Sequence, residues 1–109
     1  MIIQLGDTRA IGDFMVNNYY TKEFILDLID RVANHGLTAY YLVVKNATHN
    51  TNVTITGLTS GESYTEKSDD DGTVADLFCF QLGDQITISD GIQTMSKTLT
   101  TRSATYYFS

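Results

Sequence analysis

The chain has 109 residues, of which 42% are hydrophobic and 18% are charged, and its net charge is −6. This length predicts one domain, and the composition is too apolar for a disordered chain. The negative charge disfavours nucleic acid and anionic membrane surfaces as partners, because both repel an acidic protein. No apolar run approaches the ~20 residues that a membrane-spanning helix needs, so no membrane partner is expected.

Two features bear on the compartment in which the protein is made. Cys79 is the one cysteine of the sequence, which excludes an intrachain disulfide. It lies between Phe78 and Phe80 in an apolar segment, so we expect a small buried or half-buried side chain and not a nucleophile. Residues 1–7 lack the basic start and apolar core of a signal peptide. We therefore expect synthesis in a cytoplasm without secretion.

Residues 1–37 contain one predicted helix, at about residues 22–35. Thr21 can accept hydrogen bonds from the free amides of its first turn, and Gly36 can end it in the left-handed conformation. Charged residues, Arg31 among them, are expected largely on one face of the helix. The apolar residues recur at helical spacing on the other face: Phe24, Ile25, Leu28, Ile29 and Val32.

Residues 38–109 are rich in Thr, Tyr, Val, Ile and Ser, a composition that favours strands. Asp90-Gly91 is a hairpin signal, and Asp71-Gly72 is expected to supply a second hairpin turn. Short strands with turns every ~8–12 residues indicate a sandwich or barrel. The strands are expected at residues 38–45, 52–56, 62–67, 73–81, 85–89, 94–101 and 104–108.

The sequence therefore predicts a mainly β protein with an antiparallel sandwich of about seven strands. An N-terminal segment with one amphipathic helix precedes the sandwich. We divide the chain into residues 1–37, an arm and helix for attachment or oligomerisation, and residues 38–109, the sandwich.

The order of these elements resembles the immunoglobulin-like and transthyretin-like sandwich modules related to the carboxypeptidase regulatory domain. Residues 89–99 look like the last hairpin of such modules in bacteriophage structural proteins. The chain departs from the pattern at residues 82–85, a tighter corner without the usual Tyr, and in its lack of proline. The resemblance implies a scaffold for adhesion, assembly or decoration, with no particular ligand. The segments that carry it are Val53-Thr-Ile55, residues 64–67, Asp71-Gly72, Phe78-Cys-Phe80, Leu82-Gly83 and Ile86-Thr-Ile88.

Few residues are candidates for chemistry. Asp69, Asp70 and Asp71 are a weak candidate site for a hard cation, but the EF-hand spacing is absent and a solvated turn is the favoured interpretation. His35 and His49 stand apart without a Cys-x-x-Cys motif, so no zinc site is expected. The sequence has no Gly-x-Ser-x-Gly elbow and no glycine-rich phosphate loop. We expect no catalytic residue, no cofactor and no enzymatic activity.

Adjacent tyrosines suggest a surface for binding. Neighbours in a strand point to opposite faces, so one member of each pair should face the core. Outward tyrosines suit an interface or a sugar-binding surface, whereas packing on a sheet face is their ordinary use. The helix face must likewise pack on its own sheet, on a partner or on a second copy. The pairs are Tyr19-Tyr20, Tyr40-Tyr41 and Tyr106-Tyr107, and the candidate interface is Phe24, Ile25, Leu28, Ile29, Val32, Tyr19 and Tyr20.

With the resemblance, these features lead us to expect a non-enzymatic structural protein of a bacteriophage virion, made in the host cytoplasm. An auxiliary capsid (decoration) protein with an exposed sandwich is the first choice. Its partners would be other virion proteins, first the major capsid protein, or a second copy of the chain. The alternatives are a tail, baseplate or fibre component that binds host polysaccharide, and a cellular adhesion module.

Overall fold

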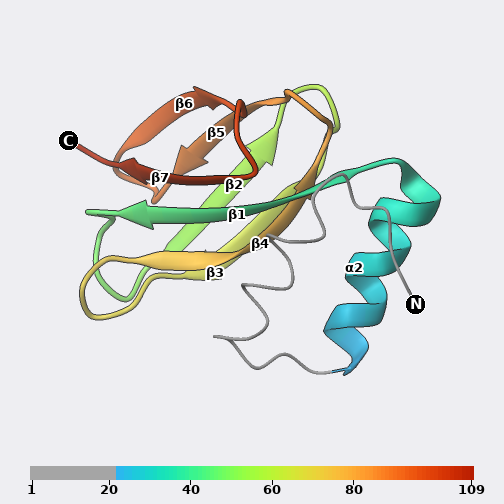
Figure 1. Ribbon diagram of the computed structural model, residues 1–109. Helices are drawn as coiled ribbons and strands as arrows, with labels where there is room; N and C mark the ends of the chain where they lie inside the picture. The colour runs from blue at the N-terminus through green and yellow to red at the C-terminus, as the bar shows by residue number, and fades with distance from the viewer. Residues whose placement is uncertain (1–21) are drawn as a thin grey trace.

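The computed structural model describes residues 22–109, which form one helix followed by seven strands (Figure 1). The predicted mainly β architecture with a preceding helix is confirmed. Tyr19 and Tyr20 lie outside the described residues. Over residues 22–109, no helix combines the length and the apolar character needed to cross a bilayer. The elements are α2 (Lys22–His35), β1 (Thr38–Lys45), β2 (Asn52–Gly57), β3 (Ser63–Lys67), β4 (Val74–Phe80), β5 (Gln85–Ser89), β6 (Thr94–Thr98) and β7 (Ser103–Tyr107).

The strands form two sheets, with the orders β4-β1-β7 and β3-β2-β5-β6. All pairs are antiparallel except β1 with β7, which is parallel. This parallel pair is a departure in detail from the antiparallel sandwich that we expected. It arises because residues 99–102 carry the chain from β6 across to the other sheet, where β7 runs in the same direction as β1.

The two predicted turns behave differently. Asp90-Gly91 closes the β5–β6 hairpin as predicted, with the Asp90 amide donating to the Gln93 carbonyl oxygen at 3.2 Å. The prediction for Asp71-Gly72 is wrong, since β3 pairs with β2 and β4 pairs with β1. This turn passes the chain from one sheet to the other.

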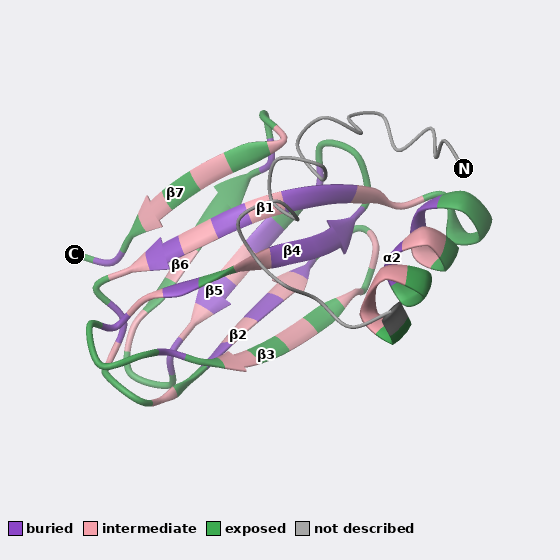
Figure 2. Ribbon diagram, turned by 60° about the horizontal axis from the view of Figure 1, so that its bottom comes forward, coloured by how far each residue is buried: buried purple, intermediate pink, exposed green. Residues whose placement is uncertain are grey.

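Alternation along the strands builds the core between the sheets. Tyr40, Leu42 and Val44 of β1 point inward and are 1%, 0% and 0% exposed. They meet inward residues of the second sheet, among them Ile55 and Ile88. The banding of buried and less buried residues along β1, β2 and β5 follows this alternation (Figure 2).

A second apolar cluster lies on the opposite face of the β4-β1-β7 sheet. Helix α2 covers this face near the start of β1 (Figure 1), and Leu28 and Val32 pack there against Leu77 and Cys79. Burying such a side chain stabilises the fold by about 1.5–3 kcal/mol. Strand β4 is therefore buried on both faces, and its last four residues are all buried. Cys79 is a buried side chain, as predicted.

The connection between the sheets needs a glycine at position 72. Gly72 has φ +74°, and a Cβ there would collide with the carbonyl oxygen of Ala47. Gly61 has a similar φ of +77°, but nothing lies near the position of its Cβ. The two glycines thus share a backbone conformation and differ in the space around them.

We expect Gly72→Ala to lower the free energy of unfolding more than Gly61→Ala does. Gly61→Ala carries only the left-handed backbone strain of roughly 1–2 kcal/mol, whereas Gly72→Ala adds a collision with backbone. Urea unfolding of both variants measures the difference. Equal losses would show that the close approach of Ala47 does not constrain this turn.

Candidate functional site

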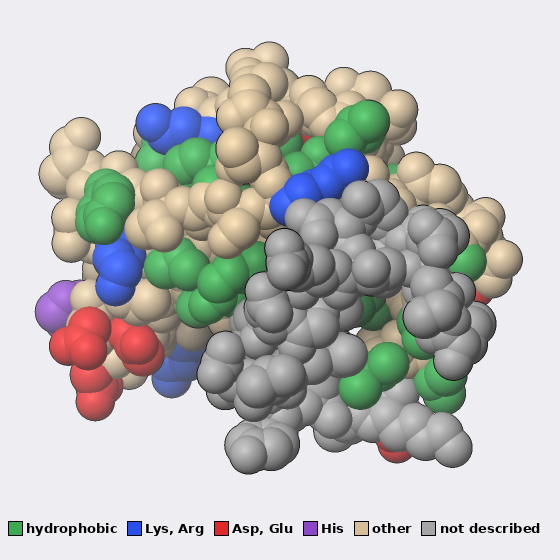
Figure 3. Space-filling model, in the orientation of Figure 1, with side chains coloured by type: hydrophobic (Ala, Val, Ile, Leu, Met, Phe, Trp, Pro, Cys, Tyr) green, Lys and Arg blue, Asp and Glu red, His purple; other side chains and the backbone are tan. Residues whose placement is uncertain are grey.

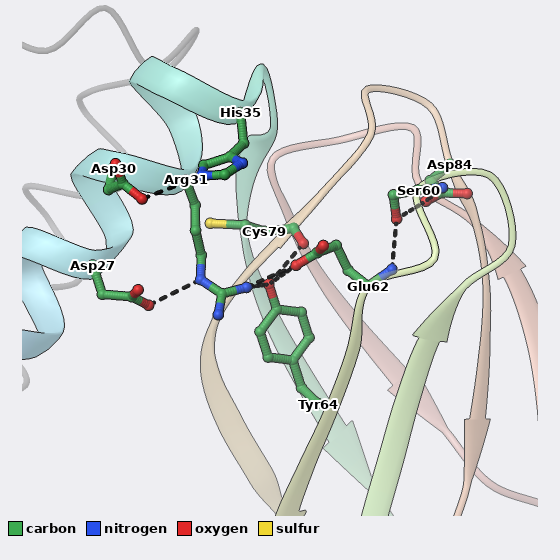
Figure 4. A network of polar contacts seen from close by, with 9 residues as sticks. All are labelled: Asp27, Asp30, Arg31, His35, Ser60, Glu62, Tyr64, Cys79 and Asp84. Atoms are coloured by element: carbon green, nitrogen blue, oxygen red, sulfur yellow. Dashed lines mark hydrogen bonds and ion pairs between the residues drawn. The ribbon is translucent and has the colours of Figure 1, made fainter.

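Arg31 is the centre of a polar network that joins α2 to the second sheet (Figure 4). Its Nε donates to Asp27 Oδ2 on the same helix at 2.9 Å. Its Nη1 donates to Glu62 Oε1 at 2.7 Å and to the Tyr64 hydroxyl at 2.9 Å. The guanidinium carbon also lies 5.4 Å from the centre of the Tyr64 ring. The helix is thereby fastened to β3 as well as to β4.

Tyr64, which contacts Arg31, also packs against the core of the sandwich. Its ring packs edge-on against Phe78 and Phe80, with centroids 5.5 and 5.4 Å away. Its hydroxyl donates to the Cys79 carbonyl oxygen at 3.0 Å, with Glu62 Oε1 3.2 Å away as a second acceptor. Tyr64 therefore ties β3 to β4 at an edge where the two sheets are not paired.

The groups of this network are suited to holding the helix and not to nucleophilic chemistry. Burial raises the pKa of the Cys79 thiol to about 12, so the thiol stays protonated at neutral pH. Burial likewise raises the pKa of the Tyr64 hydroxyl. Beside the network is a groove of about 300 Å³ lined by Asp27, Asp30, Arg31, His35, Leu37 and Glu62.

A double-mutant cycle measures what Arg31 contributes across elements. The half-buried pair with Glu62 is expected to couple by about 1.5 kcal/mol or more, as charge-assisted hydrogen bonds do. The pair with Asp27, one turn away on the exposed helix surface, should couple by only about 0.3–0.5 kcal/mol. The cycles use Arg31→Met with Glu62→Gln and with Asp27→Asn, followed by chemical denaturation. Equal coupling energies for the two pairs would contradict the conclusion that Arg31 serves mainly to join α2 to the second sheet.

Two buried aspartates fix the loops. The Asp84 carboxylate accepts from the Thr59 amide at 2.9 Å, the Ser60 amide at 3.1 Å and the Ser60 hydroxyl at 2.7 Å. At the opposite end of the sandwich, the Asp90 carboxylate accepts from the amide and hydroxyl of Thr48 and from the amide of Gln93. Burial alone would raise the pKa of each carboxyl, but these hydrogen bonds hold both pKa values below the usual range.

Glu66 and Asp76 form a carboxyl pair between the sheets. Glu66 lies opposite Val53 and Asp76 lies opposite Leu42, both core residues, so each side chain points inward from its strand. Burial, with a hydrogen bond and charge repulsion from Asp76, raises the pKa of Glu66 to about 8. The pair therefore holds a proton at neutral pH that two exposed carboxyls would have released.

Replacing this proton-dependent contact should change how stability varies with pH. Between about pH 4.5 and 8 the folded protein keeps the Glu66 proton and the unfolded chain has lost it, so stability falls as pH rises. Glu66→Gln supplies a permanent donor and should flatten this fall and raise the melting temperature at pH 7.5. Melting curves from pH 5 to 8 test this. Asp70→Asn, which removes one exposed charge, should leave the slope unchanged; a slope retained in Glu66→Gln would refute the assignment.

The acidic turn is organised by its own backbone. Acidic side chains gather near the β3–β4 connection (Figure 3). The Asp69 carboxylate accepts from the amides of Asp71 and Thr73 at 2.8 and 2.9 Å, while Asp70 and Asp71 are exposed. Across residues 22–109, no group of three or more His, Cys, Asp or Glu is placed to hold a metal ion.

The predicted interface residues divide into two groups where they are described. Leu28 and Val32 are buried against their own sheet, and Phe24 packs beside them. Ile25 and Ile29 are half-buried and extend the apolar stripe around the helix. A portion of the helix face is thus used within the domain.

The tyrosine pairs alternate as predicted where they are described. Tyr40 is buried in the core while Tyr41 is half-buried on the outer face. Tyr106 packs against the core and Tyr107 is 60% exposed. The exposed Tyr107 lies beside Lys45 at the end of the β1–β7 pair.

The prediction from sequence places Arg31 on the wrong face and misses the carboxyl pair. Arg31 lies seven residues after Phe24, two helical turns on, so the spacing alone would put it on the sheet side. Glu66 follows Tyr64 by two residues, which places both on one strand face. Both signals are present in the sequence, but a charged residue is ordinarily expected to face solvent.

A scan against models of known protein families found no match, and neither did searches of curated proteins and of solved structures. The resemblance to immunoglobulin-like or transthyretin-like modules stays a prediction. The strand order differs from the immunoglobulin constant-type order, in which the first strand pairs with the second; here β1 lies between β4 and β7.

Proposed function

We propose that the chain is a non-enzymatic structural protein of a bacteriophage virion, and within that class an auxiliary capsid protein. The observation that carries this proposal is the fastening of α2 to the sandwich through Leu28, Val32 and Arg31. A helix held in this way keeps α2, the described part of the proposed attachment segment, in fixed contact with the sandwich.

The placement of the ends supports this division of labour. Helix α2 lies at the end of the sandwich where β1 begins, and the C-terminus lies at the opposite end (Figure 1). A particle bound through the helix end would therefore carry the β5–β6 hairpin and the C-terminus outward. The net charge of −6 also favours the outer surface of a shell over its DNA-filled interior.

The attachment surface we propose combines Tyr19 and Tyr20 with the portion of the helix stripe that the sandwich leaves accessible. Ile25 and Ile29 are half-buried, and Leu26 beside them is 52% exposed. Apolar and aromatic side chains of this kind form the centres of protein interfaces.

The test is binding to particles of the phage whose genome encodes the chain. The full chain should be found in purified virions by mass spectrometry, and purified protein should co-sediment with shells that lack it. Tyr19→Ser combined with Tyr20→Ser should reduce co-sedimentation at least about tenfold, as loss of interface anchors does. Tyr107→Ser removes an exposed tyrosine at the far end and should leave co-sedimentation unchanged.

Two outcomes would overturn the proposal. The first is absence of the chain from purified virions. The second is loss of co-sedimentation in Tyr107→Ser with retention in the Tyr19 and Tyr20 variant, which would place the contact at the opposite end.

A further inference from the structure

A second pocket opens at the helix end of the sandwich, away from the Arg31 network. It has a volume of about 240 Å³, far more than the roughly 30 Å³ of one water in the liquid. Its walls come from the start of β1, the β4–β5 corner and the β6–β7 connection. The side chains that form these walls include Tyr40, Leu82, Leu99, Thr100, Thr101 and Arg102.

Arg102 supplies the cationic side chain of the pocket lining. Its Nη1 is buried and has no hydrogen-bond partner among the described residues. The guanidinium lies over the Tyr40 ring, with its carbon 5.7 Å from the ring centre. A buried donor without an acceptor costs about 1–3 kcal/mol, and more when the group is charged. Nη1 itself is shielded from solvent, so an acceptor in the open pocket can bond to it only if the guanidinium moves.

The backbone around Arg102 is fixed before any ligand arrives. The Arg102 carbonyl oxygen accepts from the Tyr41 amide at 2.8 Å, and the Leu99 amide donates to the Asp84 carbonyl oxygen at 2.9 Å. The Tyr40 hydroxyl accepts from the Gly83 amide at 3.1 Å. Because these contacts hold the three segments that form the walls, a ligand would not have to order the backbone of the pocket.

The carboxylate at the corner of this wall is already engaged. Both oxygens of Asp84 accept hydrogen bonds from Thr59 and Ser60, on the opposite side of the corner. Asp84 is not a lining residue of the pocket, and no ion pair joins it to Arg102 in the described part of the chain.

We propose that this pocket binds a carboxylate group on a short aliphatic stem, with Arg102 as the anion-binding residue. The planar guanidinium matches the two oxygens of a carboxylate. Leu82, which is 65% exposed, and the buried Leu99 provide apolar walls for the stem. Arg102 is the one cation among the described lining residues, which suits a singly charged anion better than a doubly charged phosphate.

Binding at this pocket does not depend on the proposed function, and small probes test it on the full chain. Sodium butyrate is titrated into labelled protein while amide shifts of Gly83, Thr101 and Arg102 are followed by NMR. Butyramide has the same stem without the charge and should shift these amides far less. Arg102→Gln should weaken butyrate binding at least about tenfold, the loss expected for one charge-assisted hydrogen bond.

Lys97→Gln is the matched control. Lys97 is also a cation over a tyrosine, with Nζ 5.9 Å from the centre of the Tyr106 ring, and it lies outside the pocket. This variant should bind butyrate as the unaltered chain does. Arg102→Lys keeps the charge but loses the planar fork, so its affinity should fall between the two.

Equal shifts with butyramide, or equal weakening in Lys97→Gln, would overturn the proposal. If Arg102→Gln melts so low that it cannot be titrated, the comparison of butyrate with butyramide and the Arg102→Lys variant decide. A blocked alanine peptide with one central Glu, compared with its Gln counterpart, separates two sources of the carboxylate. Glu-dependent binding tighter than that of butyrate identifies an acidic side chain of a partner protein, and binding of butyrate alone identifies a free carboxylate.

Discussion

The burial of strand β4 on both faces is the constraint on which the rest of the molecule depends. One face of β4 joins the sandwich core through Phe78 and Phe80, and the other meets α2 through Leu77 and Cys79. A sandwich strand ordinarily alternates between core and solvent, whereas a strand covered on both faces reads as a continuous apolar run. If the helix left its place, Leu77 and Cys79 would be exposed to water. The helix therefore completes the domain.

The half-buried charged residues near α2 lie where they can hold the helix against the sandwich. Arg31 reaches Glu62 and Tyr64, the Glu62 amide donates to the Ser60 hydroxyl at 3.3 Å, and that hydroxyl donates to Asp84 (Figure 4). Asp84 in turn holds the corner beside the Arg102 pocket. These hydrogen bonds therefore connect α2 to the β4–β5 corner through Glu62, Ser60 and Asp84. Such a network is most valuable where every member is satisfied, and Arg102 stands out because its Nη1 finds no acceptor among residues 22–109.

The local structure of this chain could be predicted from its residues, but the pairing of distant strands could not. The helix at residues 22–35 and the strand at 38–45 follow from capping and alternation, which act over a few residues. An Asp-Gly pair marks a turn but does not say which strands it joins, which is why the hairpin predicted at Asp71-Gly72 is wrong. The parallel pairing of β1 with β7 joins segments roughly 60 residues apart and depends on the whole fold. The roles of Arg31 and Glu66 escape prediction although their spacing places them on inward faces, because a charged residue is ordinarily expected to face solvent.

The two ends of the sandwich differ in a way that bears on binding. The end with the C-terminus carries Asp90, which closes a hairpin, and the acidic turn, where Asp69 uses its carboxylate within its own loop. Its polar groups are largely satisfied by local backbone. Exposed apolar side chains lie at both ends, Leu58 and Leu82 at the helix end and Ile92 and Tyr107 at the other. The helix end also carries the groove beside Arg31, the Arg102 pocket and, among the described residues, a buried donor without an acceptor. Grooves and unsatisfied polar groups are features that a partner can fill or satisfy. The helix end is therefore the end at which recognition by this protein is to be sought.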